Sequence, residues 1–192
     1  MKKLFALVVI LSLGTSSINA QAFSSGSSYI SLGYGLGLGY RTYTAAYQSY
    51  SGYNFSGFGP VSGAYEYGIN DNIGVGLNIS YSSYGASWNQ SYDYSYRFSS
   101  LGVLARGAYH FDIRSREADL YAGIGVGFLR YGYNWTSDEP GFNEALYDIN
   151  LGTPLGYQIF AGARYYFSPS FGVMAELGYG ISVLNAGIVI SP

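Results

Sequence analysis

The chain has 192 residues, of which 19% are aromatic and only 10% are charged, against about 25% charged in an ordinary globular domain. Both lysines lie in the leading segment, so the rest of the chain carries seven arginines against eleven acidic residues, or 7 − 11 = −4. This balance excludes a basic nucleic-acid-binding surface. The absence of cysteine excludes disulfides, thiolate metal sites and cysteine nucleophiles.

The first residues have the pattern of an export signal. Met1-Lys2-Lys3 is a short positive region, Leu4–Leu13 is apolar, and Ala20-Gln21-Ala22 fits the small-x-small cleavage rule. A membrane anchor is the alternative, but spanning a bilayer takes about 20 apolar residues. We therefore expect a signal peptide over residues 1–22, cleaved after Ala20 or Ala22, followed by one barrel domain over 23–192.

Alternation with a period of two residues dominates the chain after Phe23. In Ile30–Tyr40 and Leu120–Phe128, apolar or aromatic residues alternate mostly with glycine, serine or tyrosine, which gives each strand one apolar face. The pattern predicts strands at about 28–41, 58–69, 72–84, 95–111, 119–133, 155–167, 171–180 and 182–190.

The connections between these segments alternate in length. Short turns are predicted at 70–72, 112–118 and 168–170, and longer polar or aromatic loops at 42–57, 85–94 and 134–154. Short turns at one end and long loops at the other are typical of outer-membrane barrels. The sequence thus predicts an all-β fold, an eight-stranded antiparallel up-and-down transmembrane β-barrel. A soluble β-sandwich is the alternative.

Aromatic residues on the apolar parity mark both ends of the predicted strands. Such side chains prefer the two membrane interfaces. The short-turn end carries Tyr65, Tyr67, Tyr109, Phe111, Tyr165, Phe167 and Phe171, and the other end carries Tyr40, Tyr81 and Tyr179, with Trp88 and Trp135 nearby.

The opposite parity collects an interior charge cluster of Glu66, Arg106, Arg164 and Glu176. If the hairpin turns at Pro169, Arg164 and Glu176 become diagonal neighbours on adjacent strands, within reach of each other. Two interpretations follow: a gate on a narrow ion path, or a salt-bridge plug that fixes strand register. The plug is favoured because eight strands leave an interior that side chains can fill.

No enzymatic, cofactor or metal site is expected. The single histidine, His110, has inward parity near a short turn and is interpreted as a lumenal or rim residue rather than a catalytic one. The acidic segment from Asp138 to Asp148 has oxygen ligands suited to Ca²⁺, but its spacing matches no defined metal loop.

Aromatic residues also gather in the predicted long loops. Tyrosine offers a large amphipathic contact area at low entropic cost, which suits recognition, although it equally suits the membrane interface. The recognition candidates are Tyr47, Tyr50, Tyr53, Trp88, Tyr92 and Trp135. Arg130 has lipid-facing parity near the outer rim, where its guanidinium can meet a lipopolysaccharide phosphate.

The export signal, the glycine-alternating strands and the ending from Glu176 to Ile190, ELGYGISVLNAGIVI, resemble the small outer-membrane β-barrel proteins of Bacteroidetes-type bacteria, the porin-family or OmpA/OmpX-like barrel domains. The resemblance implies a monomer in a Gram-negative outer membrane, in contact with its lipids and lipopolysaccharide, and inserted by the barrel-assembly machinery. Such proteins usually end in an aromatic residue, whereas this chain ends Ile190-Ser191-Pro192.

The expected function is non-enzymatic. A rigid barrel would display Tyr-rich extracellular loops in an envelope-structural or surface-interaction role. The alternative is a narrow passive pore for ions or small solutes, gated by the interior glutamates and arginines. Nucleic acid is not an expected partner.

Overall fold

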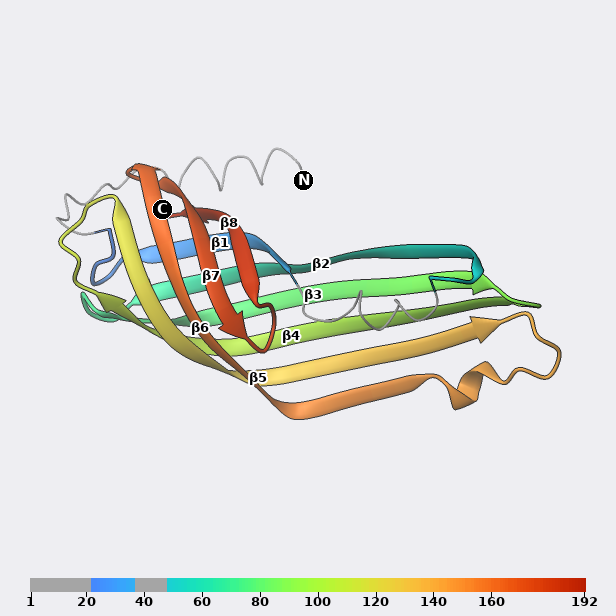
Figure 1. Cartoon of the computed structure of the whole chain (residues 1–192). Helices are drawn as coiled ribbons and strands as arrows, with labels where there is room; N and C mark the ends of the chain where they lie inside the picture. Colours follow the sequence, from blue (N-terminus) through green and yellow to red (C-terminus); the bar gives the residue numbers. More distant parts are fainter. Residues whose placement is uncertain (1–21, 37–47) are drawn as a thin grey trace, which may run out of the picture.

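The computed structural model describes residues 22–36 and 48–192, with the backbone alone described for 149–154. Eight strands hydrogen-bond in sequence order and close into a barrel, as Figure 1 shows. They are β1 (Ser28–Leu36), β2 (Ser51–Gly68), β3 (Ile73–Asn89), β4 (Asp93–Phe111), β5 (Ala118–Ser137), β6 (Ile149–Ser168), β7 (Phe171–Tyr179) and β8 (Leu184–Ile190), with a 3-10 turn, η1 (Glu144–Leu146), before β6. The predicted fold class is confirmed.

Two pairings establish the register. The barrel closes where β1 pairs with β8, from Ile30 opposite Ile190 to Leu36 opposite Leu184. In the β6–β7 hairpin, Arg164 lies opposite Met174, the register predicted from a turn near Pro169. No helix within the described ranges is long and apolar enough to cross a membrane.

Between the two ends of the short strands, the outer face is apolar. Leu32, Leu77, Ile124 and Ile159 point outward and are exposed, because period-two alternation places every second side chain on this face. The predicted aromatic ring at the short-turn end is confirmed, since all seven of its side chains are exposed on the outer face: Tyr65, Tyr67, Tyr109, Phe111, Tyr165, Phe167 and Phe171. This face forms a continuous apolar band.

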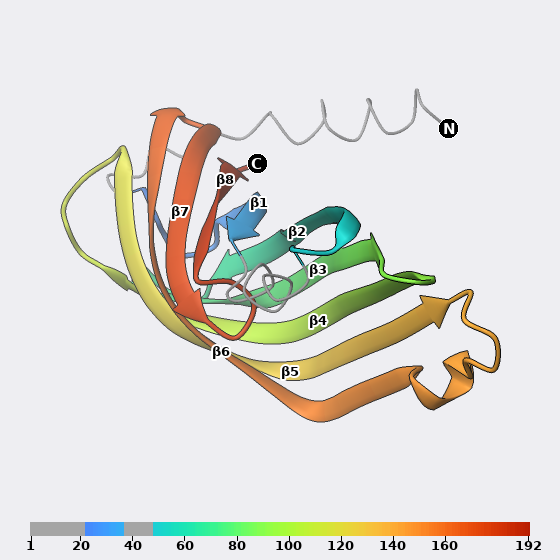
Figure 2. The same ribbon diagram turned by 45° about the vertical axis from the view of Figure 1, so that its right-hand side comes forward.

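The strands differ strongly in length. β1, β7 and β8 have 9, 9 and 7 residues, whereas β2 to β6 have 17 to 20. The five long strands continue beyond the short ones as a sheet on one side of the barrel, called here the extension, as Figure 2 shows. The predicted long loops are therefore wrong in extent: 85–94 is a hairpin with Asn89 opposite Asp93, and much of 51–57 and 134–154 is strand.

The extension keeps the two-residue period but exchanges its faces. Pairing of β3, β4 and β5 runs without a bulge, so the lumenal parity continues upward. On that parity the extension carries aromatic side chains in place of glycine and serine: Tyr84, Trp88, Tyr94, Tyr96, Phe98, Tyr131, Tyr133 and Trp135. The outward face becomes polar, with Ser87, Ser95, Arg97 and Asn134. The outer face changes from apolar to polar where the sheet leaves the apolar band, because polar groups are costly in hydrocarbon but well solvated in water.

The described residues begin just beyond most of the predicted signal peptide, and they omit 37–47. Tyr40 of the predicted outer aromatic ring and Tyr47 of the recognition candidates lie outside them. Tyr81 and Tyr179 are exposed on the outer face as predicted. Trp88 and Trp135 instead have inward parity, so they do not belong to that ring.

Candidate functional site

The predicted interior charges lie in the lumen near the short-turn end. Arg164 on β6 binds Glu66 on β2 through two hydrogen bonds of 3.2 Å, Nη1 to Oε1 and Nη2 to Oε2. Its Nη1 also lies 3.5 Å from Oδ2 of Asp119 on β5. All three side chains are buried. Each strand brings its charge inward because the residue has the parity opposite to the lipid-facing side chains.

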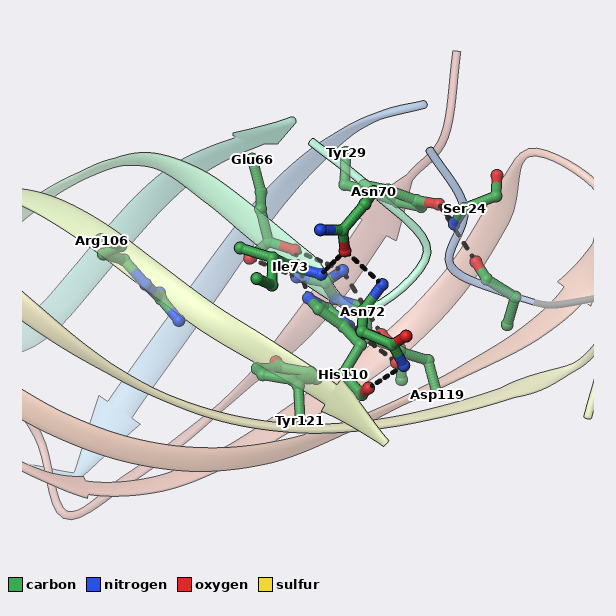
Figure 3. Close-up of polar contacts among 12 residues, drawn as sticks. Ser24, Tyr29, Glu66, Asn70, Asn72, Ile73, Arg106, His110, Asp119 and Tyr121 are labelled. Carbon is green, nitrogen blue, oxygen red and sulfur yellow. Dashed lines mark hydrogen bonds and ion pairs between the residues drawn. The ribbon is translucent and has the colours of Figure 1, made fainter. Parts of the chain in front are cut away.

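His110 on β4 lies between the two carboxylates of this cluster, as Figure 3 shows. Its Nδ1 is 2.8 Å from Asp119 Oδ1, and its Nε2 is 2.9 Å from Glu66 Oε1. A neutral imidazole carries one N–H, whereas the imidazolium carries two. Carboxylates at both nitrogens therefore fit the imidazolium, and the cluster of Glu66, His110, Asp119 and Arg164 is then electrically neutral. We call these four residues the His110 cluster.

A second ion pair lies deeper in the lumen. Arg106 Nη2 donates to Glu176 Oε1 at 2.7 Å, and the Tyr121 hydroxyl donates to the same oxygen at 2.9 Å. The Arg106 guanidinium lies 3.7 Å from the ring centre of Phe160, and the Arg164 guanidinium lies 4.5 Å from that of Tyr121. Tyr121 thus joins the two ion-paired groups.

All four predicted charges lie together in the lumen, but their ion-pair partners differ from the predicted pair of Arg164 with Glu176. Arg164 and Glu176 are diagonal neighbours on β6 and β7 as expected. Their ion pairs, however, run to residues on other strands, Arg164 to Glu66 and Glu176 to Arg106. Register within one hairpin predicts neighbours along the sheet. Contacts across the lumen depend on how the whole barrel closes, which a hairpin does not specify.

Two residues of this site were not predicted. Asp119 carries a sequence signal, because it precedes the lipid-facing Leu120 and therefore has inward parity. Phe23 carries none, because it lies before β1, outside any alternating segment. Its ring stacks on His110 with centres 3.4 Å apart and an interplanar angle of 4°, and it is 3% exposed. The backbone beside it is held by a hydrogen bond of 3.1 Å from Ala22 N to the Ser115 carbonyl.

This arrangement places buried, paired charges in the lumen. Both nitrogens of His110 face carboxylates, so no lone pair is available to take a proton from a nucleophile, as general-base catalysis requires. Over residues 22–36 and 48–192, no group of three or more suitable side chains is arranged to hold a metal ion.

Three of the six predicted recognition aromatics, Tyr53, Trp88 and Trp135, pack in the core of the extension. Trp88 is 4% exposed, stacks on Tyr94 with ring centres 5.9 Å apart, and meets Trp135 edge-on at 5.6 Å. Tyr53 packs against the same cluster. Of the five recognition candidates that the structure describes, Tyr50 and Tyr92 are the exposed ones, at 36% and 37%. The sequence therefore located the aromatic region correctly, whereas Tyr53, Trp88 and Trp135 lie in strands and pack together, not in the predicted loops.

The far end of the extension, called here the tip, is acidic and hollowed. A cleft of about 440 Å³ is lined by Trp88, Tyr94 and the carboxylates of Asp93, Asp138 and Glu144, among other residues. Neighbouring carboxylates accept hydrogen bonds from the protein itself: Glu139 accepts from the Tyr94 hydroxyl at 2.7 Å, and Asp148 accepts from Asn134 at 3.0 Å. These bonds fasten the 138–148 segment to the sheet.

Comparisons with known proteins agree with this architecture. The family model described as "Outer membrane protein beta-barrel domain" matches residues 8–187. A comparison with curated proteins finds no match. Among solved structures, the N-terminal β-barrel domain of Pseudomonas aeruginosa OprF is 14% identical with a TM-score of 0.47, covering 88% of this chain and 99% of that one.

Two further solved structures are similar. Yersinia pestis Ail, the attachment invasion locus protein, in complex with the heparin analogue sucrose octasulfate, is 17% identical with a TM-score of 0.46, covering 87% of this chain and 95% of that one. OprG from Pseudomonas aeruginosa is 12% identical with a TM-score of 0.43, covering 91% and 94%.

Proposed function

Because this chain belongs to the outer membrane protein β-barrel domain family and is an outer-membrane protein, we propose that its function is non-enzymatic surface interaction through the extension. The short-turn end would face the periplasm, and β2 to β6 would carry the extension outside the cell. The narrower origin in Bacteroidetes-type bacteria stays a prediction.

The exchange of apolar faces between barrel and extension carries this proposal. A sheet with a polar outer face and an aromatic inner core is built to stand in water, not in lipid. Its aromatic contacts include Trp88 with Trp135 and Tyr96 with Trp135, both with ring centres 5.6 Å apart. Aromatic pairs contribute about 0.5–1.5 kcal/mol each beyond the area they bury. The tip is thus held on a rigid support, which lowers the entropic cost of binding.

The lumen supports a closed barrel and not the alternative of a narrow pore. The His110 cluster and the Arg106–Glu176 pair occupy the interior with buried, mutually neutralising charges. Eight strands leave little further room. Phe23 covers His110 from the short-turn side. An ion crossing the barrel would have to break these contacts.

The test compares attachment of cells that display the wild-type chain or a tip variant, Tyr50→Ser with Tyr92→Ser. A matched control removes two exposed tyrosines at the other end, Tyr67→Ser with Tyr109→Ser. Folded barrel in the membrane is quantified by its heat-dependent gel mobility. Attachment to immobilised extracellular matrix proteins and to other cells is then measured at equal display.

We expect the tip variant to lose attachment several-fold while the control retains it. Equal attachment by wild type, tip variant and control would refute a surface-interaction role. If deletion of the gene then sensitised cells to detergent, an envelope-structural role would take its place.

A further inference from the structure

Two arginines lie on the outward face where the apolar band ends. Arg130 on β5 lies opposite Leu101, which in turn lies opposite Tyr81, so Arg130 shares the last row of apolar side chains. Arg97 on β4 lies farther up and opposite Asn134. Both are exposed. Within residues 22–36 and 48–192, the remaining arginines lie elsewhere: Arg106 and Arg164 in the lumen, and Arg114 and Arg116 at the short-turn end.

The Arg97 side chain bends toward the membrane. Its Nη1 donates to the Ser83 hydroxyl at 3.3 Å, and Ser83 lies opposite Ser99, one outward row nearer the band than Arg97. The guanidinium is therefore held at the level of Ser83 and Ser99, and not at the level of its own backbone. This direction brings the positive charge of Arg97 closer to the edge of the apolar band.

Small residues separate the two arginines on the sheet. Ser99 on β4 lies opposite Gly132 on β5, and this pair occupies the outward row between Arg130 and Arg97. Gly132 has no side chain, and Ser99 offers a hydroxyl. Arginines on either side of this row can supply N–H donors to the oxygens of one phosphate.

We propose that Arg97 and Arg130 form a binding site for a phosphate group of a glycolipid headgroup in the outer leaflet, with Ser83 and Ser99 beside it. The chain is acidic overall, so general attraction to an anionic surface does not explain this placement. The tip carries acidic residues such as Asp138 and Glu144, which repel phosphate. The site is confined to the height at which lipid headgroups lie, which selects a lipid phosphate over a soluble one.

The test uses the refolded full barrel in a neutral detergent, titrated with diphosphoryl lipid A and analysed by native mass spectrometry. The variant is R97Q/R130Q, and the matched control is R114Q/R116Q, which removes the same charge at the other end. Dephosphorylated lipid A, phosphatidylglycerol and inorganic phosphate serve as comparison ligands. Heat-dependent gel mobility verifies that each variant is folded.

We expect R97Q/R130Q to bind lipid A at least about tenfold more weakly than wild type, as loss of charge-assisted hydrogen bonds predicts, and R114Q/R116Q to bind unchanged. R97K/R130K should recover part of the affinity. Unchanged binding by R97Q/R130Q, or equal binding of dephosphorylated lipid A, would overturn the proposal. Equal binding of phosphatidylglycerol would indicate general anion attraction, and displacement by equimolar inorganic phosphate would indicate a soluble ligand; either result overturns it too.

Discussion

Replacing Arg164 by methionine removes the cation that faces two buried carboxylates, Glu66 at 3.2 Å and Asp119 at 3.5 Å. The two carboxylates then share only His110, so the cluster keeps a net charge of −1 in the lumen. Breaking a buried ion pair from one side costs about 3–5 kcal/mol, because the remaining charge stays desolvated. We expect a loss of this size in the free energy of unfolding. The double variant Glu66→Gln/Arg164→Met should lose less, since Asp119 and His110 then balance each other.

Urea unfolding of the barrel in lipid vesicles measures these free energies. Heat-dependent gel mobility follows the barrel, whereas fluorescence of Trp88 and Trp135 follows the extension, where both tryptophans lie. In planar bilayers the wild type should be silent and Arg164→Met should conduct. The reasoning is refuted if Arg164→Met lowers the free energy of unfolding by less than about 1 kcal/mol. It is also refuted if the double variant loses as much free energy of unfolding as the single variants Glu66→Gln and Arg164→Met lose together. Steady conductance of the wild type would refute the closed lumen and favour the pore.

Two more substitutions test contacts that position this site. Phe23→Ala should lower the free energy of unfolding in urea by about 3 kcal/mol or more, the usual cost of truncating a buried phenylalanine; a loss below about 1 kcal/mol would show that Phe23 does not seal His110. Gly76→Ala should reduce the refolded fraction on gels, because its Cβ would collide with the Tyr65 carbonyl oxygen. Gly107→Ala, whose Cβ meets nothing within 4 Å, is its control, and equal refolding of the two variants would contradict the close strand approach.

The short-turn ends of the strands were predictable to within a residue or two. The sixth predicted strand ends at 167 and β6 at Ser168, and both the seventh predicted strand and β7 begin at Phe171. The reason is physical. Inside the apolar band, lipid forces one face of every strand to be apolar, so parity and turn residues together determine where each strand ends.

The other ends could not be predicted by the same rule. Above the band, Trp88 is apolar on the inner parity, so a search for an apolar outer face loses its signal beyond Tyr81: the third predicted strand ends at 84, whereas β3 continues to Asn89. For this reason the sequence predicts a loop, and not strand, over residues 85–94. The fourth predicted strand is the exception, since it begins at 95 and β4 begins at Asp93.

Asp119 and His110 were both within reach of the parity argument, and they lie diagonally across the β4–β5 hairpin. The contact of His110 with Glu66 on β2 was not, since it depends on non-adjacent strands folding around a common lumen.

The seam between β1 and β8 has a consequence for assembly. It joins residues as far apart as Ile30 and Ile190, so its closure carries the largest loop-closure entropy of any strand pairing in the barrel. Before it forms, both strands expose unpaired backbone groups, each of which costs several kcal/mol in hydrocarbon. Sheets in which β1 and β8 have not yet paired are therefore unstable within a bilayer. Closure of the β1–β8 seam and entry into the membrane must be one coupled step, and its rate should fall as the bilayer thickens.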